Sequence, residues 1–291
     1  DYTGKDTDII IPEYVTADNG DGTTSVVKVN GISATAFAGK DITSIQLSDS
    51  IKSIPAGAFK NCTSLKRVKA PGVIGIGAEA FYGCAALEEF NITAKVTTIG
   101  ANAFYAVKKV DVEAGSADVA QTVASSGAKN IVMSVAGLGD ALNNRTFEIS
   151  KDTDYIAING DNSSYTNFRV VSNAGETVLN KMNLNGDVAP IKTSSSKVTL
   201  NRVAVTANGF AMILSADQTE LALNGTIKVS SSGSDAILCK MVSLKQMSAS
   251  IVGKLNVTGN VLVAGTVKND SLLTFNSGSI VSITLDEFMK Y

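Results

Sequence analysis

Residues 54–65 read Ile-Pro-Ala-Gly-Ala-Phe-Lys-Asn-Cys-Thr-Ser-Leu, and residues 76–87 repeat this pattern as Ile-Gly-Ala-Glu-Ala-Phe-Tyr-Gly-Cys-Ala-Ala-Leu. Between Val29 and Val112 the Ala-Phe pair occurs four times, and its phenylalanines stand 22, 22 and 23 residues apart. They are Phe37, Phe59, Phe81 and Phe104. A fixed period of this length is typical of a solenoid. Each repeat is too small to bury its own apolar face, so we expect the repeats to stack around one continuous core.

Between the Ala-Phe pairs, short segments alternate apolar and polar residues, as a strand with one buried face does. We expect four short parallel strands, at residues 45–47, 68–70, 90–92 and 110–112. A turn or short 3₁₀ segment that opens at Pro55 or Gly100 would then carry the Ala-Phe pair inward. Burial of each phenylalanine ring would contribute roughly 1.5–3 kcal/mol to stability.

Two further β-branched segments precede the repeats, at residues 9–11 and 26–29. They flank Asp18-Asn19-Gly20-Asp21-Gly22, a sequence rich in turn-forming residues. We therefore expect a hairpin at the start of the array that covers the first repeat. The acidic turn lacks the alternating oxygen ligands and the closing Glu of an EF-hand loop, which favours a plain turn over a calcium site.

The order Ile-Gly or Ile-Pro, a two-residue gap, Ala-Phe, then Cys, Leu and a strand resembles the BspA-type leucine-rich repeat of bacterial surface proteins. The resemblance covers residues 8 to about 135, and it departs from the pattern where Lys40 and Val107 replace the Cys. It implies a leucine-rich repeat domain over residues 1–136, with short helices or turns on its convex side.

A C-terminal cap is also implied by this resemblance. Residues 114–118 followed by residues 119–123 read as an N-capped helix, and residues 131–133 read as a closing strand. Residues 136–145 are rich in Gly, Asn and Asp, and we interpret them as a linker to a second domain.

Beyond this linker a second period of about 21 residues appears. Its apolar markers step by 21, 21, 23, 21, 19 and 12 residues along Ile158, Leu179, Leu200, Leu223, Leu244, Val263 and Phe275. Short β-branched runs fill each period with about three strands. This general pattern resembles a right-handed parallel β-helix, which we expect over residues 146–291. We therefore interpret the chain as mainly β, with two solenoids in succession.

Asparagines recur at one position of the second period. In a β-helix Asn180, Asn201 and Asn224 would stack at one corner and hydrogen-bond in a ladder. A sandwich of ordinary hairpins is the alternative, but it explains only the turns and not the period.

No histidine occurs in the chain, which excludes His-dependent triads, imidazole bases and His-ligated zinc. No Gly-rich phosphate loop follows a strand, and no paired cysteine motif is present. We therefore expect no enzyme activity and no catalytic, cofactor-binding or metal-binding residues. Carboxylates of the second half fall mostly in turn-like contexts and do not repeat at a shared strand position, which favours solvated turn residues over a polysaccharide-cleaving cluster. They are Asp154, Asp161, Asp187, Asp217 and Asp235.

Charge and cysteine content restrict the function further. The chain has 25 Lys and Arg against 27 Asp and Glu, so it lacks the basic excess that binds nucleic acid. No apolar run approaches the ~18 residues that a membrane-spanning helix requires. Cys62, Cys84 and Cys239 cannot form a complete disulfide framework, and their apolar contexts favour buried structural thiols over redox or metal chemistry.

Polar side chains that flank the inward residues of the repeat strands form two columns, which we name the strand face. Parallel strands lie ~4.8 Å apart, so Arg67, Glu89 and Lys109 would be neighbours of alternating sign. This surface is either a recognition face or an exposed ladder of ion pairs, each contributing about 0–1 kcal/mol. The first column holds Ser44, Arg67, Glu89 and Lys109, and the second holds Gln46, Lys69, Asn91 and Asp111. Tyr82 and Tyr105 follow the repeat phenylalanines, either as contact aromatics on the outer side or packed against the next repeat.

Together these features favour a non-catalytic, adhesin-like protein, secreted or on the bacterial cell surface, that recognises a host or matrix protein or a glycan. The alternative is a glycan-binding or polysaccharide-cleaving β-helix module with an accessory repeat domain, and a third reading is a spacer. The chain starts at Asp1 rather than Met, which suggests a trimmed leader or an upstream lipid or cell-wall anchor. We expect a monomer without cofactors, nucleic-acid partners or a transmembrane segment.

Overall fold

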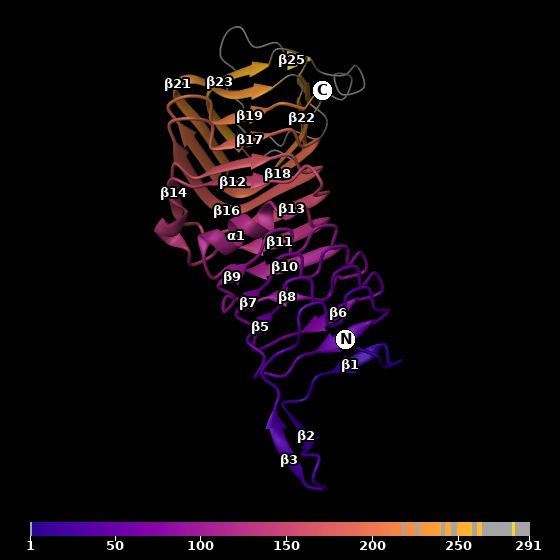
Figure 1. The fold of residues 1–291 in the computed structure, drawn as a ribbon. Coiled ribbons are helices and arrows are strands. Elements are labelled where there is room, and N and C mark those ends of the chain that lie inside the picture. Colours follow the sequence, from indigo (N-terminus) through magenta and orange to yellow (C-terminus); the bar gives the residue numbers. More distant parts are fainter. Residues whose placement is uncertain are drawn as a thin grey trace. The chain divides into compact units, whose positions relative to one another are not determined.

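The computed structural model describes residues 2–216, 219–224, 227–239, 242–245, 249–257, 261–263 and 281–282. These residues form strands and turns together with one α-helix and one 3₁₀ helix. The chain divides into two compact units, Asp1–Val132 and Met133–Tyr291. In each unit parallel strands stack from one chain repeat to the next, which confirms the mainly β, solenoid fold class (Figure 1).

The first unit contains two rows of short parallel strands. One row holds β1 (Asp8–Ile10), β4 (Ser44–Gln46), β6 (Arg67–Lys69), β8 (Asn91–Ile92) and β10 (Lys109–Glu113). The other row holds β5 (Ser53–Ile54), β7 (Gly75–Ile76) and β9 (Thr98–Ile99). The four repeat strands predicted from the alternation are β4, β6, β8 and β10. The second row was not predicted, because its strands are only two residues long.

Glycines bring successive repeats close together beside the second row. The backbone N–H of Gly77 donates to the carbonyl of Ile54, and that of Gly100 to the carbonyl of Ile76, both at 2.8 Å. A Cβ atom at Gly77 would lie 2.4 Å from the backbone nitrogen of Ala56, far inside contact distance. Only glycine fits at this approach.

The repeat phenylalanines form one buried stack, with successive ring centroids between 5.2 and 5.8 Å apart. At one end the ring of Tyr2 lies 5.5 Å from that of Phe37. Cys62 and Cys84 fill one repeat position beside the stack and are fully buried. The sequence therefore identified the core of the repeats.

The hairpin at the start of the array differs from the expected one. Its antiparallel strands are β2 (Tyr14–Asp18) and β3 (Thr24–Lys28), whereas β1 pairs in parallel with β4. The side chains of Asp18 and Asp21 accept hydrogen bonds from the backbone N–H groups of Gly20 and Thr23, so the tight turn pairs the segments directly beside it. The residues of the hairpin are largely exposed (Figure 1), and the first repeat is covered instead by Tyr2 and β1.

The repeats are followed by the expected helix and strand. The helix α1 (Ala117–Ala124) begins after Ser116, whose hydroxyl oxygen accepts a hydrogen bond from the backbone N–H of Val119 at 3.2 Å. It buries Val119, Ala120 and Val123 on its inner face. The strand β11 (Asn130–Ser134) comes next, and the boundary between the two units falls within it.

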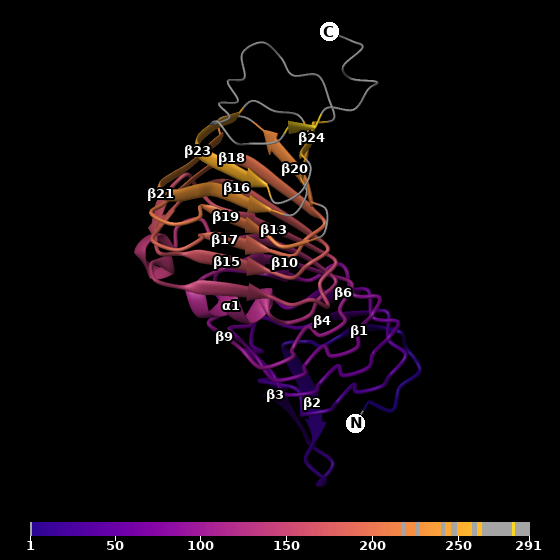
Figure 2. The ribbon, with the colours of Figure 1, turned by 90° about the horizontal axis from the view of Figure 1, so that it is seen from above.

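The second unit winds three rows of parallel strands around a buried interior (Figure 2). The first row holds β13 (Tyr155–Asn159), the first halves of β16 (Glu176–Gly186) and β18 (Lys197–Ala207), then β20 (Thr219–Asn224), β22 (Val242–Lys245), β24 (Val261–Val263) and β25 (Val281–Ser282). The second row holds β14 (Ser164–Thr166), the second halves of β16 and β18, and then β21 (Ile227–Cys239) and β23 (Ala249–Val257). The third row holds β12 (Thr146–Ile149), β15 (Arg169–Ser172), β17 (Ile191–Thr193) and β19 (Met212–Leu214), and β19 pairs with the end of β21.

Strand register supports a parallel β-helix rather than a hairpin sandwich. Ile158, Leu179, Leu200 and Leu223 are register partners in successive coils, as the period predicts. Leu244 departs from this series, because it pairs with Leu221 rather than Leu223. Coil length is not constant along the unit, so a single step along the sequence cannot assign every register. Phe275, the last predicted marker, lies outside the described residues.

The predicted asparagine ladder forms at the corner after the first row. The Nδ2 atom of Asn180 donates to Oδ1 of Asn159 at 2.6 Å, and Nδ2 of Asn201 donates to Oδ1 of Asn180 at 2.5 Å. Asn224 is the backbone register partner of Asn201 in the next coil, and its side chain lies outside the described part of the structure.

Residues 136–145 are packed onto the second unit and do not form a free linker. They include the 3₁₀ helix η1 (Gly139–Leu142), and the side chain of Leu142 is fully buried. The backbone N–H of Gly137 donates to Oδ2 of Asp161, and that of Asn144 to the carbonyl of Thr166. The Gly, Asn and Asp residues that suggested a linker instead shape the turns of the first coil.

Candidate partner-binding face

The strand face lies on the row formed by β4, β6, β8 and β10. Ile45 and Val68 point into the core, so the residues on either side of them point outward. Parallel pairing places Ser44 beside Arg67, Gln46 beside Lys69, Arg67 beside Glu89, and Asn91 beside Asp111. The structure therefore arranges the eight residues in two neighbouring columns.

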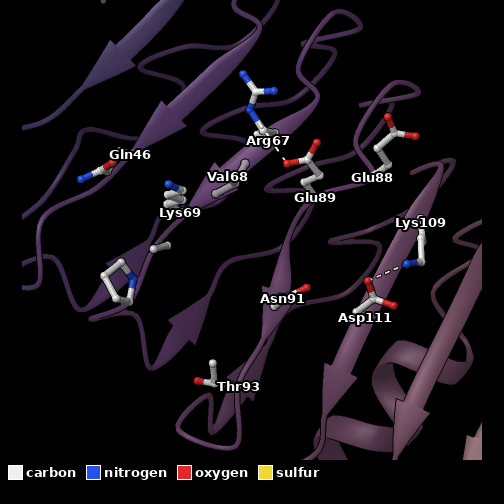
Figure 3. A pocket seen from close by; sticks show the side chains of 12 residues that line it. Gln46, Arg67, Val68, Lys69, Glu88, Glu89, Asn91, Thr93, Lys109 and Asp111 are labelled. Atoms are coloured by element: carbon white, nitrogen blue, oxygen red, sulfur yellow. Dashed lines mark ion pairs between the residues drawn. The ribbon is translucent and has the colours of Figure 1, made fainter.

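A groove of ≈ 570 Å³ runs over this row of strands (Figure 3). Seven of the eight strand-face residues line it, and Val68, Ala70 and Pro71 add an apolar portion. These seven are Gln46, Arg67, Lys69, Glu89, Asn91, Lys109 and Asp111. Glu88 and Thr93 also line the groove and were not among the predicted residues. Glu88 was missed because it precedes the alternating segment of its repeat.

Ser44 is the strand-face residue that does not line the groove. Its hydroxyl donates to Oδ1 of Asp8 at 2.5 Å, and the hydroxyl of Thr43 donates to the same atom at 2.9 Å. The hydrogen bond from Ser44, followed by that from Thr43, lowers the pKa of the Asp8 carboxyl group. Sequence reasoning missed Asp8 because it assigned β1 to the hairpin instead of this row.

Ion pairs on the strand face differ in part from the expected ladder. Arg67 Nε lies 3.9 Å from Glu89 Oε2, so these two neighbours do pair (Figure 3). Lys109 instead pairs with Asp111 of its own strand, at 2.8 Å, and not with Glu89. A lysine side chain has several rotatable bonds, and residues two apart on a strand project from the same side, so the nearer carboxylate competes with the neighbouring strand.

Charges of both signs are balanced along the groove. Its lining includes three cationic side chains and three carboxylates. Glu88 pairs with Lys108 at 2.6 Å, and the hydrogen bond from Lys108 lowers the pKa of the Glu88 carboxyl group. Lys69 forms no ion pair among the described residues. Because both signs alternate over a short distance, the groove suits a partner that carries both charges and hydrogen-bonding groups.

Tyr82 and Tyr105 pack against each other and lie outside this groove. Their ring centroids are 5.0 Å apart with planes tilted by 19°, and both side chains are half-buried. Lys60 Nζ lies 5.1 Å from the centroid of the Tyr82 ring and 2.6 Å from Glu79 Oε2. Packing between successive repeats therefore accounts for both tyrosines.

Among the carboxylates considered for catalysis, those that the structure describes do not form a common site. Asp161 accepts hydrogen bonds from the backbone N–H groups of Gly137 and Ser163, and Asp187 accepts one from Asn208. No group of three or more Cys, Asp or Glu side chains close enough to hold a metal ion occurs in the part of the chain that the structure describes. Asp217 and the side chain of Asp235 lie outside that part.

The two described thiols have a structural role. Their Sγ atoms donate to backbone carbonyls one repeat away, from Cys62 to Phe37 at 2.9 Å and from Cys84 to Phe59 at 3.0 Å. Burial raises the pKa of Cys62 to about 11 and that of Cys84 to about 12. Both thiols therefore stay protonated and unreactive at neutral pH, as predicted. The side chain of Cys239 is outside the described residues.

Comparison with known proteins supports the resemblance found in the repeats. Residues 30–120 match the family model of the BspA type leucine rich repeat region in 6 copies. No curated protein matches the chain. A leucine-rich repeat protein from Bacteroides ovatus ATCC 8483 is similar at 15% identity and a TM-score of 0.35, over 95% of this chain and 92% of that one. A leucine rich cell surface protein from Faecalibacterium prausnitzii A2-165 is similar at 16% identity and a TM-score of 0.35, over 99% and 91%.

Proposed function

We propose that this chain is a non-catalytic binding protein of the bacterial surface or its surroundings, and that it recognises a host or matrix protein through the strand face. The groove over β4, β6, β8 and β10 is the observation that carries the proposal, because seven outward residues from successive repeats line one continuous surface. Leucine-rich repeats of the BspA type occur in bacterial surface proteins, which supports an extracellular location.

The charge pattern of the groove favours a protein over a strongly charged glycan. Arg67 and Glu89 are each more than half exposed and lie at 3.9 Å, so a partner can exchange this pair for its own charges at small cost. Lys69 supplies a further cation between Gln46 and Asn91, whose amides both donate and accept hydrogen bonds. A neutral glycan remains the second class of ligand, because amides and paired charges also bind hydroxyl groups.

No helix among the described residues has the length and hydrophobicity needed to cross a membrane. We propose that the chain acts as a monomer, with the groove accessible on each copy. Recognition by an array of repeat strands needs no cofactor, since the contacts are hydrogen bonds and ion pairs.

A quadruple alanine variant at Arg67, Lys69, Glu89 and Lys109 tests the proposal. The wild-type chain is first screened against immobilised extracellular-matrix proteins and neutral and acidic glycans. The variant should keep its urea unfolding midpoint, because exposed ion pairs contribute only about 0–1 kcal/mol each. Its affinity for the partner found in the screen should fall below detection, since these side chains dominate the groove.

A matched control replaces Lys5, Lys52, Lys95 and Asp49 with alanine. These exposed residues lie outside the groove, and their loss changes the net charge by the same amount. Binding that survives in the control and disappears in the strand-face variant supports the proposal. Equal binding by both variants would overturn it, and release of new sugar ends from any glycan by the wild type would overturn the non-catalytic assignment.

A further inference from the structure

The second unit carries an unusual pair of residues beside the asparagine ladder. Lys181 and Arg202 directly follow Asn180 and Asn201, and they have φ angles of 53° and 54°. This left-handed region is unfavourable for residues with long side chains, whereas Asn and Gly tolerate it. The other described non-glycine residues of this unit with positive φ are all asparagines, namely Asn144, Asn162 and Asn167.

The preceding coil shows which residue this corner accepts without strain. Ser164 and Asn183 are register partners, and they stand two residues after Asn162 and Lys181 respectively. Asn162 therefore occupies the position of Lys181 one coil earlier, and it has a φ of 70°. Two successive coils thus place a long cation where the neighbouring coil has the favoured asparagine.

Lys181 and Arg202 also bring two positive charges close together. Asn180 and Asn201 are register partners, so the residues that follow them lie on adjacent coils, ~4.8 Å apart along the stack. Like charges in this position repel each other. Both side chains are exposed, and neither forms an ion pair within the described part of the chain. Strained backbone and uncompensated charge occurring together point to a ligand that offsets both.

A groove of ≈ 580 Å³ lies between these cations and the ladder. Its lining consists of Asn159, Gly160, Asn180, Lys181, Asn201 and Arg202. None of these six residues is aromatic or aliphatic, so the groove lacks the anchors that dominate protein interfaces. Asn180 uses one N–H and one acceptor position in the ladder, and an amide group has a second of each. The surface therefore combines two cations with a row of amides.

We propose that this corner binds an acidic polysaccharide. Lys181 and Arg202 contact its carboxylate or sulfate groups, which match the planar donor pair of the guanidinium and the point charge of the ammonium. The ladder amides contact hydroxyl groups of the same chain. Asp161, in the preceding coil, does not line the groove, and its carboxylate accepts hydrogen bonds from Gly137 and Ser163. The site lies wholly in the second unit and shares no residue with the strand face, so it does not rest on the function proposed above.

Binding of the full chain to three polymers tests this assignment at physiological salt. Polygalacturonate carries carboxylates, dextran sulfate carries sulfates, and unmodified dextran is neutral. We expect the wild type to bind one or both acidic polymers and not dextran, and the preferred polymer identifies the anionic group. The affinity of the double variant Lys181→Asn/Arg202→Asn for the acidic polymer should be lower by a factor of about ten or more, since this variant loses both charge-assisted contacts. Asn suits the left-handed conformation, so this variant should unfold at the same or a higher temperature.

The matched control is Lys151→Asn/Lys192→Asn, which removes the same charge from exposed positions of the same unit outside the groove. It should bind within about twofold of the wild type, because distant exposed charges contribute little at this salt concentration. The quadruple strand-face variant should also bind these polymers normally. Equal losses in the two double variants, equal binding to dextran, or no binding of the wild type to either acidic polymer would overturn the proposal.

Discussion

The rings of Phe59 and Phe81 lie parallel in the core of the repeat unit, with centroids 5.2 Å apart and planes within 7° of each other. This spacing follows from the ~4.8 Å separation of parallel strands, because each ring is attached to a neighbouring repeat. Each phenylalanine therefore covers the face of the next one. The loss of any interior ring opens a cavity between two repeats and weakens both.

Replacement of Phe81 with alanine should lower the free energy of unfolding by roughly 3–5 kcal/mol, because a fully buried ring leaves a cavity. Urea unfolding of the full chain measures this change. The control Ile74→Ala should cost less than about 1 kcal/mol, since that side chain is 47% exposed. An unchanged midpoint for the Phe81 variant would show that the rings are not the core of the array.

The ladder predicts an order of stabilities in the second unit. Asn180 donates to Asn159 and accepts from Asn201, so Asn180→Ala breaks two hydrogen bonds and should cost roughly 0.5–1.5 kcal/mol for each one. Asn159→Ala breaks only the bond to Asn180 and should cost less. Thermal unfolding of the two variants gives the comparison, and the reverse order would contradict a ladder that runs through Asn180.

Acid should weaken the second unit through Asp161. Hydrogen bonds from the Ser163 side chain and from the backbone N–H groups of Gly137 and Ser163 lower the pKa of this carboxyl group to about 2. A lowered folded pKa contributes stability that is present above about pH 4 and is lost as the pH falls through about 2. The Asp161→Asn variant should be less stable than the wild type at pH 6. Between about pH 4 and pH 2 the stability of the variant should fall less than that of the wild type, as urea unfolding midpoints would show. If the midpoints of the two proteins fell in parallel over this range, Asp161 would not have this role.

Alkali should weaken the repeat unit through its thiols. Burial raises the pKa of Cys62 to about 11 and that of Cys84 to about 12. A raised folded pKa contributes stability that is present below the ordinary value of about 8.5 and is lost as the pH rises toward 11. The stability of the wild type should therefore fall more steeply over this range than that of the Cys62→Ala/Cys84→Ala variant. Tyrosines and lysines titrate in both proteins, so the difference between the two slopes is the quantity to measure, and a difference of zero would argue against buried thiols.

Features that recur in the sequence were predictable, because repetition along the chain becomes stacking in space. The period places Phe59 above Phe81 and Asn180 above Asn201 without any knowledge of long-range contacts. Both rows of side chains were found in this way. The pairing of β1 with β4 was not predictable from the period, since β1 is separated from its partner by a hairpin that the other repeats lack.

The candidate sites show the same limit at the level of single side chains. The columns of the strand face follow from strand alternation, but the choice of Asp111 over Glu89 by Lys109 depends on rotamers that no repeat pattern encodes. The left-handed backbone of Lys181 and Arg202 was also not predictable. Residue type argues against that conformation at both positions, and only the turn that the whole coil must make imposes it.

The close approach of repeats at Gly77 and Gly100 gives the second row of strands a direction in which it can grow by gene duplication. Pro55 holds the equivalent position directly after β5, the first strand of its row, where no preceding strand requires an N–H donor. A proline at Gly77 would lack the N–H group that binds Ile54, and its ring would collide with the backbone of Ala56. A repeat that carries glycine here can be copied into the interior of the array. Pro55 instead ends this second row at β5, so the row can be lengthened only on the side of β9, although the phenylalanine stack continues past Pro55 to Phe37.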